Sequence, residues 1–477
     1  MSALRRGACA TPVAILLAAL GGCAVGPDYV RPELDMPEAY PITVDGQTGA
    51  DLADIAWFDL FDDPRLDSLI GTALDDNLEL RSALARVLEA RQGARFANAS
   101  RWPNIGGALA SSPAPGVGNN DTNYSLGIAF AWELDFFGKL RRNAAAAEAD
   151  ALASEEGARA VTVSLVSAVA ASYVQILELD RRIDIVERTI ESQTESLELV
   201  EELKVNGVSS AAEQNQAAAL LASTKASLPE LRRARIATEN GLSVLLGRPP
   251  QSFVPAGTVP QTPELPDFTV DLPVELLADR PDIRAAEEQL RAATNRVGVA
   301  IANRFPFPTL GLTALAARFS PSLDGLFDDG TDAFSWGPTG SIPLIDFGRT
   351  DSAVQIADAQ LLQAAQAYQL AVLSALREVT DALAGLEAAS EVITHNRERT
   401  DAAAEVLRLQ RLRFRQGVVA YLEVLDAERQ LLAASLELAT AEFGRVQRFI
   451  ELYRALGGGA DEERLERTME ALQASGS

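Results

Sequence analysis

Two copies of one short stretch decide the fold: Glu133-Leu134-Asp135-Phe136-Phe137-Gly138-Lys139 and, 210 positions later, Leu344-Ile345-Asp346-Phe347-Gly348-Arg349. In both copies a run of alternating apolar residues ends at Phe-Gly, and Lys or Arg then opens a very long helical pattern. The stretch therefore predicts a joint at which a strand gives way to a long helix, and the chain makes this joint twice.

The strand before the first joint alternates strictly. Its large apolar residues fall on one face: Tyr124, Leu126, Ile128, Phe130, Trp132, Leu134 and Phe136. The residues between them are small or polar, a pattern typical of a transmembrane β-strand. The alternation is longer than the ~9–11 residues that a tilted strand needs to cross a bilayer. The alternative is an amphipathic strand of a soluble sandwich.

The helical pattern after the joint is unusually long. No proline occurs in residues 139–204, which corresponds to ~100 Å of helix at ~1.5 Å per residue. A heptad row (Ile176, Ile183, Ile190 and Leu197) and a companion row (Leu179, Val186, Gln193 and Val200) predict coiled-coil packing. Asn206-Gly207 ends the pattern, and a return helix follows.

The second half of the chain repeats the first. Gly138 matches Gly348, and Gly207 matches Gly417, both at an offset of 210. We divide the chain into a signal peptide (1–22), an extended N-terminal segment (23–53), a first repeat (54–273), a second repeat (274–457) and a flexible C-terminal tail (458–477). The first repeat is expected to hold strands 104–112 and 123–137, a long helix 139–204 and a return helix 211–246. The second is expected to hold a helix 280–303, strands 308–319 and 335–347, a long helix 349–415 and a return helix 419–456.

The N-terminus resembles the export signal of a bacterial lipoprotein. Arg5 and Arg6 precede a short apolar core, and Leu20-Gly21-Gly22-Cys23 has the form of a lipobox. Cys23 would carry the lipid, and Ala24 after it directs such lipoproteins to the outer membrane. The alternative is an ordinary signal peptide with a chance cysteine. Cys9 leaves with the signal, so no disulfide can form within one mature chain.

Charge and composition exclude several functions. The net charge is −25, and −27 without the signal peptide, which argues against nucleic-acid binding. His395 is the only histidine, and Cys23 is the only cysteine of the mature chain, so a transition-metal site is not expected. The sequence contains no nucleophile motif and no phosphate-binding loop. We therefore expect no enzyme activity and no cofactor other than the lipid on Cys23.

The strand count predicts an oligomer. Four strands cannot close a membrane barrel, and open sheet edges are not tolerated in lipid. A trimer would supply twelve strands and twelve helical rods. The expected fold class is mainly α with a membrane β-barrel: a trimeric 12-stranded barrel, continued by a long periplasmic α-helical coiled-coil barrel, with an internal two-fold repeat.

Several motifs carry a family resemblance. They are Cys23-Ala24-Val25-Gly26-Pro27-Asp28-Tyr29, Trp57-Phe58-Asp59-Leu60-Phe61-Asp62-Asp63-Pro64 and, most specific, Leu276-Leu277-Ala278-Asp279-Arg280-Pro281-Asp282-Ile283-Arg284-Ala285-Ala286-Glu287. With these motifs the mature chain resembles the outer-membrane efflux proteins of the TolC type, in their lipidated OprM/NodT branch. The resemblance implies a homotrimeric exit duct that works with a periplasmic membrane-fusion adaptor and an inner-membrane RND-type transporter.

The resemblance also implies site residues at the turns between the long helices. Gly207, Val208, Gly417 and Val418 would form the periplasmic tips that meet the adaptor. Glu213, Glu423 and Asp426 would form an inward acidic constriction; the alternative is that they are solvated helix-face acids. Val419 stands where some relatives carry an Arg that ties the tips shut, and Arg413 and Arg415 lie near it. The alternative function is a non-conducting, structural coiled-coil lipoprotein.

Overall fold

The computed structural model describes residues 24–34, 36, 37, 40, 50, 51, 63–113, 122–252, 265, 268, 269, 280–305, 309–328, 330–341, 344–458 and 462–475. The expected signal peptide and Cys23 lie outside the described residues, as do parts of the segment 23–53 and most of the segment 249–273. The chain divides into two compact units. The first contains Arg86–Glu156 and Ile283–Ala371 with the N-terminal residues to Leu34, and the second contains Asp35–Ala85, Gly157–Asp282 and Val372–Ser477.

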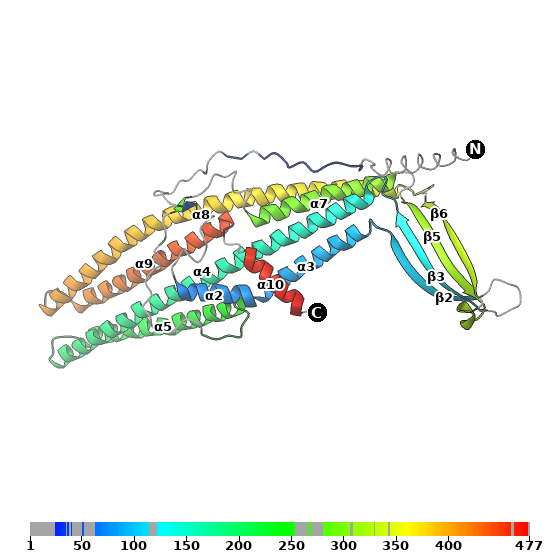
Figure 1. The fold of residues 1–477 in the computed structure, drawn as a ribbon. Coiled ribbons are helices and arrows are strands. Elements are labelled where there is room, and N and C mark those ends of the chain that lie inside the picture. Colours follow the sequence, from blue (N-terminus) through cyan, green and yellow to red (C-terminus); the bar gives the residue numbers. More distant parts are fainter. Residues whose placement is uncertain are drawn as a thin grey trace, which may run out of the picture. The chain divides into compact units, whose positions relative to one another are not determined.

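Helices make up most of the described chain (Figure 1). They are α2 (Pro64–Asp76), α3 (Leu78–Ala99), α4 (Lys139–Val205), α5 (Ala211–Leu245), α7 (Pro281–Arg304), α8 (Arg349–Arg415), α9 (Tyr421–Leu456) and α10 (Glu462–Ser475), with a 3-10 turn η2 (Asp324–Leu326). The long helices α4 and α8 have 67 residues each. This equality reflects the internal repeat.

The strands belong to two sheets. The larger one has the order β2 (Asn104–Pro113), β3 (Thr122–Glu133), β5 (Thr309–Ser320) and β6 (Thr331–Ser341), with every neighbouring pair antiparallel. Each repeat thus supplies one hairpin, and β3 pairs with β5 between the two. The smaller sheet is a parallel pair of β1 (Ala50–Asp51) with β4 (Phe268–Thr269).

The register separates the two faces of the larger sheet. Directly opposed residues of antiparallel strands lie on the same face, and one such row joins Ile105, Phe130, Ala314 and Trp336. That face carries the large apolar residues that the alternation of β3 predicts. The opposite face carries mostly Gly, Ala, Ser and Thr, as in the row Gly106, Ala129, Leu315 and Ser335.

At both joints the strand ends earlier than the sequence suggests. The strands predicted to reach 137 and 347 end at Glu133 and Ser341. The reason is helix capping: Asp135 accepts hydrogen bonds from the backbone N–H groups of Leu140 and Arg141, at 3.1 and 2.9 Å. A carboxylate can reach these free N–H groups only if the chain leaves the sheet first.

The glycine of each joint makes the turn. Gly138 and Gly348 have φ values of +76° and +84°, which only glycine adopts without strain. Asp346 repeats the cap at the second joint, where it accepts a hydrogen bond from the Thr350 N–H at 3.1 Å. The joint is therefore a structural device built twice from the same residue types.

The heptad rows of α4 are unequally buried. In the companion row Leu179, Val186, Gln193 and Val200 are all buried, whereas Ile183 and Ile190 of the other row are half-buried. By length and composition α4 alone among the described helices is apolar enough to cross a membrane, yet 56% of its most apolar window is buried inside the protein. This burial is typical of a packed core helix.

The motif Arg280-Pro281-Asp282 joins three helices. The Arg280 guanidinium is buried; it donates to the Ala455 carbonyl at the end of α9 at 2.5 Å and forms ion pairs with Glu378 of α8 and Asp282 of α7. Pro281 is the first residue of α7, where a missing N–H costs nothing. The most specific motif of the sequence is thus a structural junction.

The expected flexible tail is wrong for residues 462–475, which form α10. Leu465 and Met469 lie one helical turn apart and are both buried. A packed apolar stripe of this kind stabilises even a short helix. The high charge of the tail made this stripe hard to recognise in the sequence.

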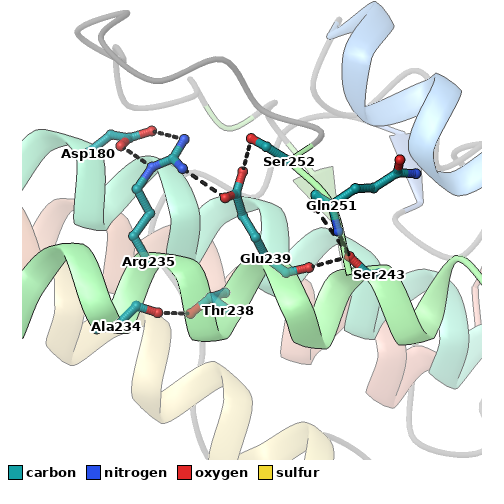
Figure 2. A network of polar contacts seen from close by, with 8 residues as sticks. All are labelled: Asp180, Ala234, Arg235, Thr238, Glu239, Ser243, Gln251 and Ser252. Carbon is teal, nitrogen blue, oxygen red and sulfur yellow. Dashed lines mark hydrogen bonds and ion pairs between the residues drawn. The ribbon is translucent and has the colours of Figure 1, made fainter. Parts of the chain in front are cut away.

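A buried polar network fastens α4 to α5 in the second unit (Figure 2). Arg235 of α5 donates to Asp180 of α4, with Nε 2.5 Å from Oδ1, and pairs with Glu239 at 2.9 Å. Ser252 beyond the helix donates to Glu239 at 2.8 Å. Asp180, Arg235 and Glu239 are all buried, so the guanidinium offsets two carboxylates that water does not reach.

Replacing Arg235 should therefore destabilise the helical unit. Arg235→Ala leaves two buried carboxylates without their cation, and we expect a loss of about 3–5 kcal/mol in the free energy of unfolding. Urea unfolding of the purified protein, followed by circular dichroism, measures this loss. The control is Arg445→Ala, at the repeat-equivalent and exposed position, which should change stability by no more than about 0.5 kcal/mol. Equal effects of the two substitutions would contradict this role.

Candidate functional site at the hairpin turns

The two turns between the long helices have the same backbone geometry. Gly207 and Gly417 have φ values of +74° and +72°. The following N–H of Val208 donates to the Leu203 carbonyl at 2.8 Å, and that of Val418 donates to the Arg413 carbonyl at 2.9 Å. This is the Schellman ending of a helix. The glycines thus form the turns, as expected, and leave both valines exposed.

The first turn is closed by a capping box. Ser210 accepts a hydrogen bond from the Glu213 N–H at 3.2 Å, and the Glu213 carboxylate accepts from the Ser210 N–H at 2.8 Å. The Ser209 hydroxyl adds a third hydrogen bond at 2.9 Å. The Ser210 backbone and the Ser209 hydroxyl lower the pKa of Glu213. Its carboxylate is therefore held in place and kept ionised.

The second turn lacks this box. Its N-cap is Ala420, which offers no side-chain acceptor, and the equivalent glutamate, Glu423, is exposed. Asp426 lies one turn further along α9, is exposed, and accepts a hydrogen bond from Gln430 at 2.7 Å. Residues three apart share a helix face, so Glu423 and Asp426 present their carboxylates on one side of α9.

An apolar cluster joins the two hairpins just behind the turns. It contains buried residues from four helices: Val200 of α4, Ala217 and Leu220 of α5, Leu407 of α8, and Tyr421, Val424, Leu425 and Ala427 of α9. The Phe414 ring packs on the Tyr421 ring at 5.1 Å between centroids. Burial and the nearby Glu428 charge raise the pKa of Tyr421 to about 12. The cluster holds both turns at one end of the second unit.

A second ion pair, with a half-buried arginine and a buried glutamate, lies behind this cluster. Arg411 of α8 pairs with Glu428 of α9 at 2.8 Å and donates to Ser192 of α4 at 2.6 Å. Ser196 donates to Glu428 at 3.0 Å. Ser192, Arg411 and Glu428 border a cavity of about 290 Å³ together with the buried Gln193. Sequence reasoning missed this contact; the polar Gln193 in an otherwise apolar heptad row was its one signal.

Among the described residues, Arg413 and Arg415 form no ion pair with Glu213, Glu423 or Asp426. Arg413 donates to Gln410 at 3.5 Å, and Val419 is half-buried. Across the described ranges no group of three or more His, Cys, Asp or Glu residues is arranged to hold a metal ion.

The N-terminal segment reaches the first joint. The Val25 N–H donates to the Phe137 carbonyl at 3.1 Å, and a Cβ on Gly138 would lie 2.8 Å from the Ala24 Cα. Further along, Arg142 pairs with Asp28 at 2.7 Å. The motif that begins at Cys23 therefore docks its next residues against the start of α4.

Comparison with known proteins agrees with this architecture. The family described as outer membrane efflux protein matches residues 69–248 and 272–458. The solvent efflux pump outer membrane protein SrpC of Pseudomonas putida is 33% identical, covering 92% of this chain and 96% of SrpC. The cation efflux system protein CusC of Escherichia coli is 32% identical, covering 92% and 97%. The probable outer membrane lipoprotein SilC of Salmonella typhimurium is 31% identical, covering 92% and 96%.

Solved structures are similar over the same length. A structure of CusC has a TM-score of 0.81 at 31% identity and covers 92% of this chain and 100% of its own. The open state of the MtrE outer membrane channel of Neisseria gonorrhoeae has a TM-score of 0.81 at 29% identity and covers 92% and 99%.

Proposed function

The chain belongs to the family of outer membrane efflux proteins, and we propose that three copies of it enclose one passive exit duct. It is the outer-membrane channel of a tripartite efflux pump and extends into the periplasm. The observation that carries the proposal is the four-stranded sheet. Within the part of the chain that the structure describes, no further strand pairs with the outer edges of β2 and β6.

Two open edges in a membrane require partners. Each unpaired backbone group in hydrocarbon costs several kcal/mol, so the edges of β2 and β6 favour pairing with copies of the same chain. Head-to-tail pairing of one edge with the other closes a ring. Large apolar side chains are exposed just outside both edge strands. Trp102, which precedes β2, is 70% exposed, and Leu344 and Phe347, which follow β6, are 90% and 96% exposed. A neighbouring copy would cover them.

The oligomer is testable directly. Native mass spectrometry of the protein purified in detergent should show a complex of three chains, because three sheets of four strands close a barrel of common size. A dominant single chain that retains its sheet would rule out this arrangement.

The acids at the turns are proposed to form the constriction. Glu423 and Asp426 share one side of α9, and Glu213 is held ionised at the first turn. In a trimer these three positions give nine carboxylates at one end of the duct. Rings of carboxylates favour cations and repel anions. The alternative is that the three residues are solvated acids on a helix surface. It predicts that replacing them has no effect on the current through the channel.

Planar-bilayer recordings separate these alternatives. Glu423→Ala with Asp426→Ala should raise the conductance and lower the selectivity for K⁺ over Cl⁻, because side chains and charges leave the narrowest part of the duct. Gln216→Ala is the matched control, since Gln216 is the exposed repeat equivalent of Asp426. Unchanged conductance would remove the acids from the gate. Absence of current in every variant would reject the duct.

The proposed partners and the exported solute follow from the place of this channel in a tripartite pump. We propose that the turns, with the exposed Val208 and Val418, meet a periplasmic adaptor, and that an RND-type transporter of the inner membrane supplies the solute. Relatives of nearly equal similarity are named for a solvent pump and for a cation system. The duct therefore accepts what its transporter delivers. A purely structural coiled-coil lipoprotein would leave the membrane sheet without a role.

We further propose that Cys23 carries the lipid anchor. Ala24 docks at the joint where the first membrane strand gives way to α4, so an acyl chain on the preceding residue would lie where strands leave the bilayer. The relative SilC is named a probable outer membrane lipoprotein.

Metabolic labelling tests the anchor. Cys23→Ala should abolish incorporation of labelled palmitate, because the thiol that takes the diacylglycerol is absent, whereas Cys9→Ala should leave incorporation unchanged. Label retained after Cys23→Ala would show that the lipid sits elsewhere.

A further inference from the structure

The small-residue face of the membrane sheet carries two large apolar side chains. The strand register places 23 residues of β2, β3, β5 and β6 on this face, and nearly all are Gly, Ala, Ser, Thr or Asn. Leu315 and Phe319 of β5 are its only large apolar side chains within the described strands. The larger apolar residues of the other face suit lipid, so the small-residue face would line the lumen.

Both of these side chains stand above small neighbours. Leu315 lies between Ala129 of β3 and Ser335 of β6, and Phe319 lies between Ser125 and Thr331 of the same two strands. None of these four side chains is large enough to bury them, so Leu315 and Phe319 remain 40% and 41% exposed.

The loop after β5 leaves Phe319 open. Its 3-10 turn η2 is held to the other face of the sheet, where Arg318 donates to the Leu326 carbonyl at 3.4 Å. Neither Leu315 nor Phe319 therefore packs in a core of the chain, and neither faces lipid.

We propose that Leu315 and Phe319 of three chains form an apolar band inside the barrel that contacts apolar and aromatic solutes on their way out. This inference rests on the proposed trimeric duct and names a solute class for it. A lumen lined by small hydroxyl and methyl groups offers an apolar solute little apolar surface to contact, so little of the solute's surface is removed from water. Phe and Leu side chains offer apolar area and, for Phe319, an aromatic ring on which another ring can stack.

The band is tested by current block in the channel opened with Glu423→Ala and Asp426→Ala. Two probes share a charged head: tetramethylammonium, and benzyltrimethylammonium, which adds one aromatic ring. Benzyltrimethylammonium should halve the K⁺ current at a lower concentration than tetramethylammonium does. Leu315→Ser with Phe319→Ser should raise the half-blocking concentration of benzyltrimethylammonium about fivefold, the worth of one aromatic contact. That of tetramethylammonium should rise less, because its ammonium group can meet the Phe319 ring but brings no ring to stack on it.

Two further variants make the result specific. Ala317→Ser lies on the same strand and face, between the two residues, and should leave both probes unchanged. Thr331→Leu adds an apolar side chain beside Phe319 and should strengthen the block by benzyltrimethylammonium. A trimer mass and K⁺ conductance equal to those of the parent show that the barrel of each variant has formed.

The outcomes separate this inference from the proposed function. The apolar band is overturned, and the duct stands, if the double Ser variant and Thr331→Leu both carry current and neither changes the block by benzyltrimethylammonium. No current from the opened channel itself overturns the duct and the band with it.

Discussion

The constraint on which the rest of the structure depends is the pairing of backbone groups in lipid. A four-stranded sheet satisfies its interior hydrogen bonds and leaves the outer edges of β2 and β6 open among the described residues. In water such edges cost little, but in hydrocarbon they must be paired. One chain with two hairpins is therefore an incomplete wall. The exposed Trp102, before β2, and Phe347, after β6, fit the same incompleteness.

The joint converts one periodicity into another within a few residues. A membrane strand needs alternation, whereas a long helix needs an apolar stripe, and the chain changes between them at a glycine with positive φ. The carboxylate of Asp135 or Asp346 then satisfies the first N–H groups of the helix. Phe347, at φ +53°, is the one non-glycine residue with positive φ in the described chain. That strain persists only where surrounding structure holds it.

Sequence reasoning succeeded where a period or a special residue determines the structure. Alternation in β3 identified the face of the sheet that carries the large apolar residues, and Gly207 and Gly417 identified the turns. It failed where the structure depends on contacts between distant residues. The ends of the strands depend on helix capping. Capping ends each strand before the alternating pattern of the sequence ends, so the pattern alone places the strand end too late. The ion pairs of Arg235 with Asp180 and of Arg411 with Glu428 join separate helices, and no local pattern announces such partners.

The repeat also shows how equal backbones can carry unequal chemistry. Both turns end in the same glycine geometry, yet Ser210 and Glu213 close a capping box at the first turn, while Ala420 leaves Glu423 without that role at the second. A carboxylate that caps a helix stabilises it and is not free to move. A carboxylate on an exposed face costs the fold nothing to move or neutralise. The second hairpin is thus the half of the repeat in which the position of an acid can change without loss of the turn.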